Sequence, residues 1–285
     1  MRRSLLGMLG IAALAGCGAL VGVTDLEVTG DATVEVPDAT PPAKDSGPPE
    51  PIVDAMPPAD VDGAPPPTRP APGVYTYSLT GRDEVKQIAW NKSYDGTKGT
   101  LTITHEGESC FTEAVHIRQD YDETFHFCQK GSDFVQDTGT RAQKFSFGFG
   151  AATNQECKPG DVYFPQAPVA AQSWTHDCLG SNAADGNGKK GGSTFRTVGP
   201  FTFVGPEVKT VAGTNVDVYH YHDDRVVSDS QKGTNMAEWF ISRSGVLVRL
   251  ERTITITYDS FIGPITYAES LTMTLDALLP LPLPP

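Results

Sequence analysis

Positive charge is scarce in this sequence. Lysine and arginine number 22, against 35 aspartates and glutamates, and the formal net charge of the 285 residues is −13. Proteins that bind nucleic acid hold phosphates with clustered lysine and arginine, so this balance argues against a nucleic-acid partner. The same deficit argues against electrostatic adsorption to anionic lipid headgroups.

Signatures of catalysis and metal binding are also missing. The sequence has no Gly-x-Ser-x-Gly elbow, the turn that presents the nucleophile in many hydrolases. It has no Cys-x-x-Cys spacing, which would favour a zinc site. Its carboxylates are abundant but scattered, and they define no catalytic pair. We therefore predict no cofactor and no enzymatic activity, and keep a hydrolytic enzyme as an alternative.

Aromatic residues are absent from residues 18–72. Thirteen of the 23 prolines fall between Pro37 and Pro72, among acidic residues that repel one another. Such a segment cannot bury enough apolar surface to offset the entropy lost on ordering, and proline favours extended conformations. We predict that residues 17–72 form a disordered tether headed by Cys17.

Long stretches with a 3.6-residue apolar period are missing too. From Gly73 onward apolar and polar residues alternate instead, most clearly over residues 246–258 and 265–275. About a dozen such strands separated by turn residues predict an all-β fold. The expected domain, residues 73–277, is a single antiparallel meander forming a curved sheet or half-barrel. Residues 278–285 are expected to be a Pro/Leu-rich tail, because proline cannot donate to a ladder.

The N-terminus carries an export signal. Arg2 and Arg3 precede an apolar run from Leu5 to Ala15, and small residues follow. The sequence Leu14-Ala15-Gly16-Cys17 resembles the lipobox of bacterial lipoproteins. This resemblance implies a signal peptide at residues 1–16, cleavage before Cys17, and acylation of Cys17, which would then be the anchor.

Two other interpretations of the N-terminus remain open. Leu5–Val23 is nearly long enough for an uncleaved transmembrane helix, and Arg2-Arg3 could belong to a twin-arginine signal. In each case the chain leaves the cytoplasm. The aspartate that retains some bacterial lipoproteins at an inner membrane is absent after Cys17, where Gly18 stands. The resemblance to lipoproteins therefore implies a lipid-anchored cell-envelope protein at an outer membrane or cell surface.

The cysteine count supports the lipobox. Five cysteines leave one without an intramolecular partner, and Cys17 is the odd one. In an oxidising compartment the other four, Cys110, Cys128, Cys157 and Cys178, allow three connectivities. The segment between Cys110 and Cys128 has the pattern of a hairpin centred near residue 119. We therefore favour Cys110–Cys128 and Cys157–Cys178.

The domain resembles an uncharacterised family of secreted or lipid-anchored all-β proteins of high-GC bacteria. The similarity rests on the stretches "PGVYTYSLTG", "SWTHDC" and "AEWFISRSGVLVRLERT" with "IGPITYAESLTMTL". It implies an all-β meander, and because the family has no established activity the resemblance adds nothing about function. The C-terminal meander also resembles the curved half-barrel of lipoprotein carriers, which cradle acyl chains; this is an analogy of fold alone.

Three groups of residues are candidates for a site. Arg252 and Glu269 interrupt the apolar faces of the last two strands, and we expect an internal ion pair or a polar anchor in a pocket. The aromatic residues Phe145, Phe147, Phe149 and Trp239 would line a concave face. His220 and His222 share a strand face and are candidate metal ligands, but no third ligand is evident. We therefore predict no metal site and expect a half-buried polar strand end at these histidines.

Two classes of function follow. The first is a binding module for a lipid or other apolar ligand, held on the aromatic face. The second is a structural or adhesive surface protein with a filled interior. An open apolar cavity of several hundred Å³ would favour the first class. The sequence indicates a membrane partner through the anchor and does not define an oligomeric state.

Overall fold

The computed structural model describes residues 69–131, 133–145, 150–164, 168–182, 192–260 and 263–283. The expected signal peptide, Cys17, most of the tether, Phe147 and Phe149 lie outside these ranges. Within them, no helix has the length and apolar character needed to cross a bilayer.

The described chain is built almost wholly from β-strands, as the alternation predicts. A short 3₁₀ segment, η1 (Lys86–Ile88), follows the first strand. The strands are β1 (Gly73–Val85), β2 (Trp90–Ser93), β3 (Thr97–Glu106), β4 (Cys110–Arg118), β5 (Tyr121–Lys130), β6 (Asp133–Lys144), β7 (Gly150–Phe164), β8 (Ser173–Asn182), β9 (Thr194–Val211), β10 (Thr214–Asp229), β11 (Gln231–Ser242), β12 (Leu247–Ser260) and β13 (Gly263–Leu275).

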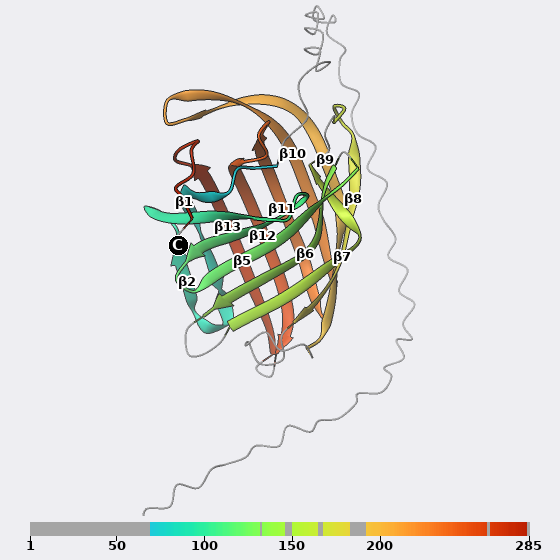
Figure 1. Ribbon diagram of the computed structural model, residues 1–285. Helices are drawn as coiled ribbons and strands as arrows, with labels where there is room; N and C mark the ends of the chain where they lie inside the picture. The colour runs from blue at the N-terminus through green and yellow to red at the C-terminus, as the bar shows by residue number, and fades with distance from the viewer. Residues whose placement is uncertain are drawn as a thin grey trace, which may run out of the picture. The chain divides into compact units, whose positions relative to one another are not determined.

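The strands form one antiparallel meander, which confirms the predicted fold class. From β3 onward each strand pairs with the next, β1 pairs with β3, and β13 pairs back with β1. The sheet therefore closes into a barrel (Figure 1), which goes further than the expected curved sheet or half-barrel. Short β2 pairs with the second half of β1, and β3 pairs with the first half.

Closure brings β1 and β13 very close at one point. At Gly81 the backbone has φ 108°, and a Cβ there would lie 2.0 Å from the carbonyl oxygen of Ser270. A side chain at this position would collide with the neighbouring backbone, and the positive φ is strained for other residues. Glycine at this position therefore permits the pairing that closes the barrel.

The long β9–β10 hairpin curves over the upper end of the barrel in Figure 1. Its register shifts between His220 and Tyr221, an irregularity that allows the hairpin to bend. Val211 and Val218, near its turn, are each 1% exposed and belong to the main apolar cluster. The upper end is therefore packed with apolar side chains.

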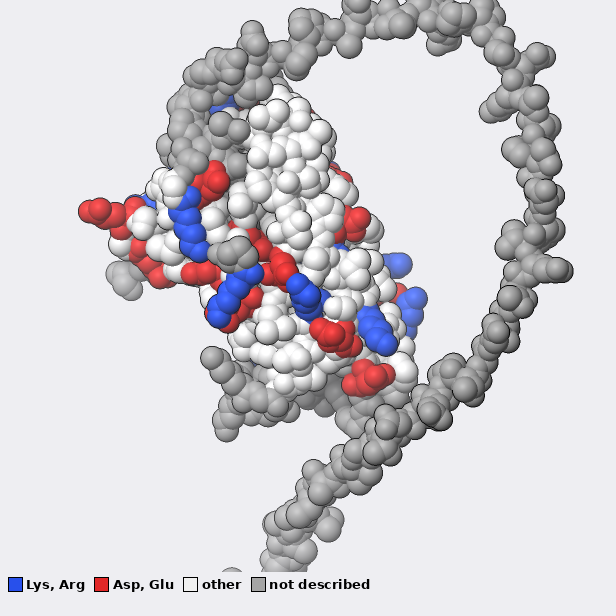
Figure 2. All heavy atoms as spheres, turned by 90° about the vertical axis from the view of Figure 1, so that its right-hand side faces the viewer, with Lys and Arg blue, Asp and Glu red and all other residues white. Residues whose placement is uncertain are grey.

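Alternation sorts the side chains between the inside and the outside of the barrel. Ile254 is 1% exposed, whereas its neighbours Thr253 and Thr255 are exposed. The outer face over β7–β9 carries lysine and arginine interspersed with aspartate and glutamate, as Figure 2 shows. One such outer ion pair joins Arg196 to Asp177.

Both disulfides join directly opposed residues on neighbouring strands. Cys110 pairs with Cys128 between β4 and β5, and Cys157 pairs with Cys178 between β7 and β8. This is the local connectivity that the hairpin pattern predicts. The Pro/Leu-rich tail is also tied down, because Leu281 exchanges two backbone hydrogen bonds of 2.9 Å with Val74.

Candidate binding cavity

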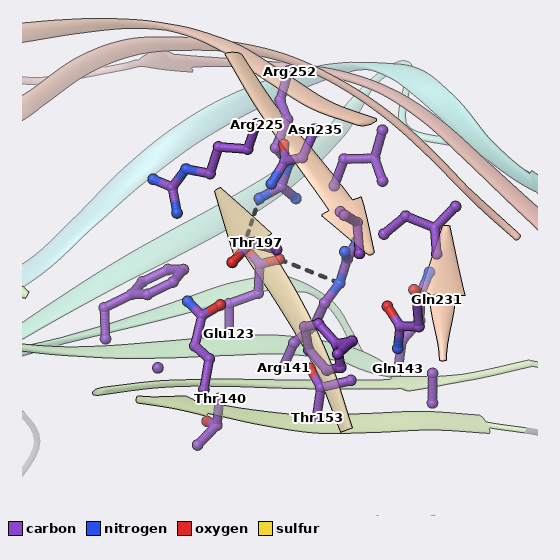
Figure 3. Close-up of a pocket in the computed structure, with 18 of the residues that line it drawn as sticks. Glu123, Thr140, Arg141, Gln143, Thr153, Thr197, Arg225, Gln231, Asn235 and Arg252 are labelled. Carbon is purple, nitrogen blue, oxygen red and sulfur yellow. Dashed lines mark hydrogen bonds and ion pairs between the residues drawn. The ribbon is translucent and has the colours of Figure 1, made fainter. Parts of the chain in front are cut away.

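A cavity of about 150 Å³ lies inside the barrel (Figure 3). Its walls come from β5, β6, β7 and β9–β13, and they reach from the middle of the barrel towards the end opposite the β9–β10 turn. A cavity of this volume accommodates a molecule about the size of benzene. The interior is therefore neither filled nor as large as the several hundred Å³ expected for a lipid carrier.

Aromatic rings form much of the apolar wall. Phe127 stacks on Tyr163 with ring centroids 4.5 Å apart, and Trp239 meets Tyr163 edge-on at 5.4 Å. Phe145 lines the cavity just beyond the end of β6. Of the aromatic residues predicted from the sequence, Phe145 and Trp239 are thus at the cavity, and Phe147 and Phe149 lie outside the described residues.

Gly139 makes room for an amide side chain inside the barrel. It lies on β6 opposite Phe125 and Gln155, and it lines the cavity. A Cβ at this position would come within 2.7 Å of Gln155 Nε2, so even a methyl group would displace that side chain. Glycine in the middle of a strand marks a place where another group approaches the backbone closely.

Arg252 and Glu269 meet inside the barrel, beside the cavity. Arg252 Nε donates to Glu269 Oε1 at 2.7 Å, Nη1 to Glu123 Oε2 at 2.8 Å, and Nη2 to the Tyr121 hydroxyl at 2.9 Å. Arg252 is 7% exposed and Glu269 3%. A buried ion pair needs such additional hydrogen bonds to offset desolvation.

Arg141 on β6 is the second cation of this network. Its Nη2 donates to Glu269 Oε2 at 3.1 Å, and its Nε lies 3.4 Å from Glu123 Oε1. Figure 3 shows Arg141 and Arg252 both reaching Glu123. Burial alone would raise the pKa of Glu269, but Arg252, Arg141 and hydrogen bonds from Tyr267 and Tyr121 outweigh it and hold the pKa at about 2.

Asp223 and Arg225 form a separate pair on the cavity wall, both on β10. Arg225 Nε and Nη2 each lie 2.8 Å from an oxygen of Asp223, which is a two-point contact. Burial raises the pKa of Asp223, and Arg225 opposes that rise. The opposite charges of Asp223 and Arg225 therefore compensate each other in the barrel interior.

Sequence reasoning missed most of these polar residues. Glu123 alternates in sequence with Tyr121 and Phe125, so its inward position follows from the same period-2 rule that located Arg252. Arg141 offered no such signal, because its neighbours on the inward face of β6 are Gly139 and Gln143. Its role depends on which strands lie opposite.

His220 and His222 lie on the outer face of β10, away from the cavity. His220 Nδ1 is 2.7 Å from Glu207, its Nε2 is 2.7 Å from Glu238, and His222 Nδ1 is 2.7 Å from the other oxygen of Glu238. His220 also stacks on Phe240 at 4.3 Å. In the described part of the chain, the convergent sets of metal-ligating side chains surround the two disulfides and do not contain these histidines.

Comparison of the chain with protein-family models, with curated proteins and with solved structures returns no match. The resemblances noted in the sequence stay predictions.

Proposed function

We propose that this protein is a cell-envelope lipoprotein whose barrel holds a small molecule in its interior cavity. The lipobox-like sequence ending at Cys17 and the proline-rich segment after it support an anchored domain on a tether. The two disulfides support an oxidising compartment. The absence of the retention aspartate after Cys17 favours the outer membrane or the cell surface.

The interior cavity carries the proposal of binding. Small-molecule sites are concave and mostly apolar, with a few placed polar groups, and the aromatic wall with its arginines, carboxylates and amides has this character. The volume favours a small ligand over the long acyl chain of a lipid carrier. A purely structural or adhesive barrel gains nothing from leaving this space unfilled, since empty volume lowers stability.

The arrangement of charge favours binding over hydrolysis. Glu123, Glu269 and Asp223 each contact an arginine. A general acid or base needs freedom to exchange a proton with substrate, and these ion pairs work against such exchange. The hydrolytic alternative therefore receives no support from the cavity.

Native mass spectrometry of the full chain purified from its own host tests the proposal. We expect a co-purifying small molecule that Val227→Phe expels, because Val227 is 3% exposed and lines the cavity. Val226→Phe is the matched control, since the adjacent Val226 is 57% exposed on the outer face and its replacement should leave the molecule bound. A fully folded protein that carries nothing would favour the structural alternative.

A further inference from the structure

We infer that the ligand of the cavity is an uncharged ring compound that carries both a hydrogen-bond acceptor and a hydrogen-bond donor. This inference rests on the proposed function, since it names the chemistry of what the cavity holds. It depends on three observations, which concern the charges of the cavity, its unpaired polar atoms and the shape of its walls.

The charges at the cavity balance internally. Three arginines and two carboxylates line the cavity, and Glu269, which contacts Arg141 and Arg252 without lining it, is the third carboxylate of the network. Each of these six groups makes at least one ion pair: Arg141, Arg225 and Arg252 with Glu123, Asp223 and Glu269. A charged ligand would find no unpaired group of opposite charge in the cavity, and a buried charge without a partner is strongly unfavourable. The balance therefore selects against both acids and amines.

Two amide side chains at the cavity are incompletely satisfied. Gln136 is 3% exposed, and its Nε2 has no hydrogen-bond partner within the described ranges. Asn235 Oδ1 likewise has no hydrogen-bond partner within the described ranges. Gln136 on β6 and Asn235 on β11 both line the cavity. A buried polar atom without a partner is costly, so a ligand that accepts from Gln136 and donates to Asn235 would recover that cost.

The indole nitrogen of Trp239 adds a weaker donor. It has no partner at hydrogen-bond geometry, yet it lies close enough to Asp223 to oppose, with Arg225, the rise that burial causes in the pKa of that carboxyl. The protein therefore offers the ligand one donor, Gln136 Nε2, and one acceptor, Asn235 Oδ1. The Trp239 N–H is partly engaged by Asp223. Charge-neutral amide and hydroxyl groups fit these positions.

The walls favour a ring. Phe127, Tyr163 and Trp239 pack on one another and line the cavity, so an aromatic ring entering it meets an aromatic wall that it can contact edge-on or offset. The volume of about 150 Å³ sets the size near that of a single six-membered ring with a small substituent. Benzamide has this size, no charge, a carbonyl acceptor and an amide donor, so it is a suitable probe.

Calorimetric titration of the full-length protein with four matched probes tests the inference. Benzamide, benzoate, benzylammonium and benzene share the ring and differ in charge and hydrogen bonding. We expect benzamide to bind roughly tenfold more tightly than each of the others. Equal or tighter binding of benzoate, benzylammonium or benzene would overturn the inference and leave the proposed function standing.

Failure of all four probes, with no co-purifying molecule, would overturn the proposed function and the inference together. Gln136→Leu and Asn235→Leu should each weaken the binding of benzamide by roughly tenfold and leave the affinity for benzene unchanged. Gln129→Leu is the matched control, because Gln129 is exposed, and it should change neither affinity. Loss of benzene binding along with benzamide in the two cavity variants would contradict the assigned hydrogen bonds.

Discussion

Arg252 on β12 and Glu269 on β13 lie diagonally across neighbouring strands, with Arg252 Nε 2.7 Å from Glu269 Oε1. Their direct cross-strand partners are Leu271 and Ile254. Through Glu123, Arg252 also contacts β5, which lies across the barrel interior from β12. One buried guanidinium thus ties two walls of the barrel together.

Replacement of Arg252 tests the value of this contact. Arg252→Met would leave Glu123 and Glu269 buried with fewer partners, so we expect a loss of about 3–5 kcal/mol in the free energy of unfolding, measured by urea denaturation. Arg249→Met is the matched control on the same strand. Arg249 pairs with Glu251 on the outer face, where its side chain is 38% exposed, and its loss should cost under about 1 kcal/mol. Equal losses would contradict a special role for the interior pair.

Acid should destabilise the barrel through Glu269. Its pKa in the folded protein is about 2, below the ordinary value of 4.5. The contribution is therefore present above pH 4.5 and is lost as the pH falls from 4.5 towards 2, because the unfolded chain takes up the proton first. Glu269→Gln should be less stable at pH 7 and should lose less stability over that range. Denaturation at a series of pH values measures this slope, and an unchanged slope would refute the assignment.

Glu113 should make the barrel less stable as the pH rises, which is opposite to the effect of Glu269. Burial raises the pKa of this carboxyl from 4.5 to about 8. The folded protein then keeps a proton that the unfolded chain releases, so stability falls as the pH rises from 4.5 through 8. Glu113→Gln, which is neutral throughout, should raise Tm at pH 8.5 by roughly 2–4 °C for each kcal/mol regained and change it little at pH 4.5. A gain of the same size at both pH values would argue against this titration.

The anchor is tested at Cys17. Cys17→Ser removes the thiol that would be acylated, so the protein should move from the membrane to the soluble fraction, and incorporation of labelled palmitate should stop. Gly18→Ser, one residue further on, keeps the thiol and should keep both properties. Retention of Cys17→Ser on the membrane would favour an uncleaved helix at Leu5–Val23.

Local patterns in the sequence determined a large part of this fold. Alternation with period 2 placed Arg252 and Glu269 on inward faces and threonines on outward ones, because a strand turns successive side chains to opposite sides. The hairpin between Cys110 and Cys128 likewise predicted their pairing, since the partners of a hairpin lie at equal distances from its turn. The odd count showed that one cysteine lacks an intramolecular partner, and the lipobox-like sequence before it singled out Cys17 as that residue.

Only the tertiary structure decided that the sheet closes and leaves a cavity. Tyr77 and Leu275 are paired across the closure although they stand at opposite ends of the domain, and alternation carries no information about how far apart paired strands lie. The cavity, and the lack of a partner for Gln136 Nε2 within the described ranges, depend on side chains from many strands around the ring. Period and charge are properties of neighbours along the chain, whereas an unfilled volume is set by the sum of all the side chains that face it.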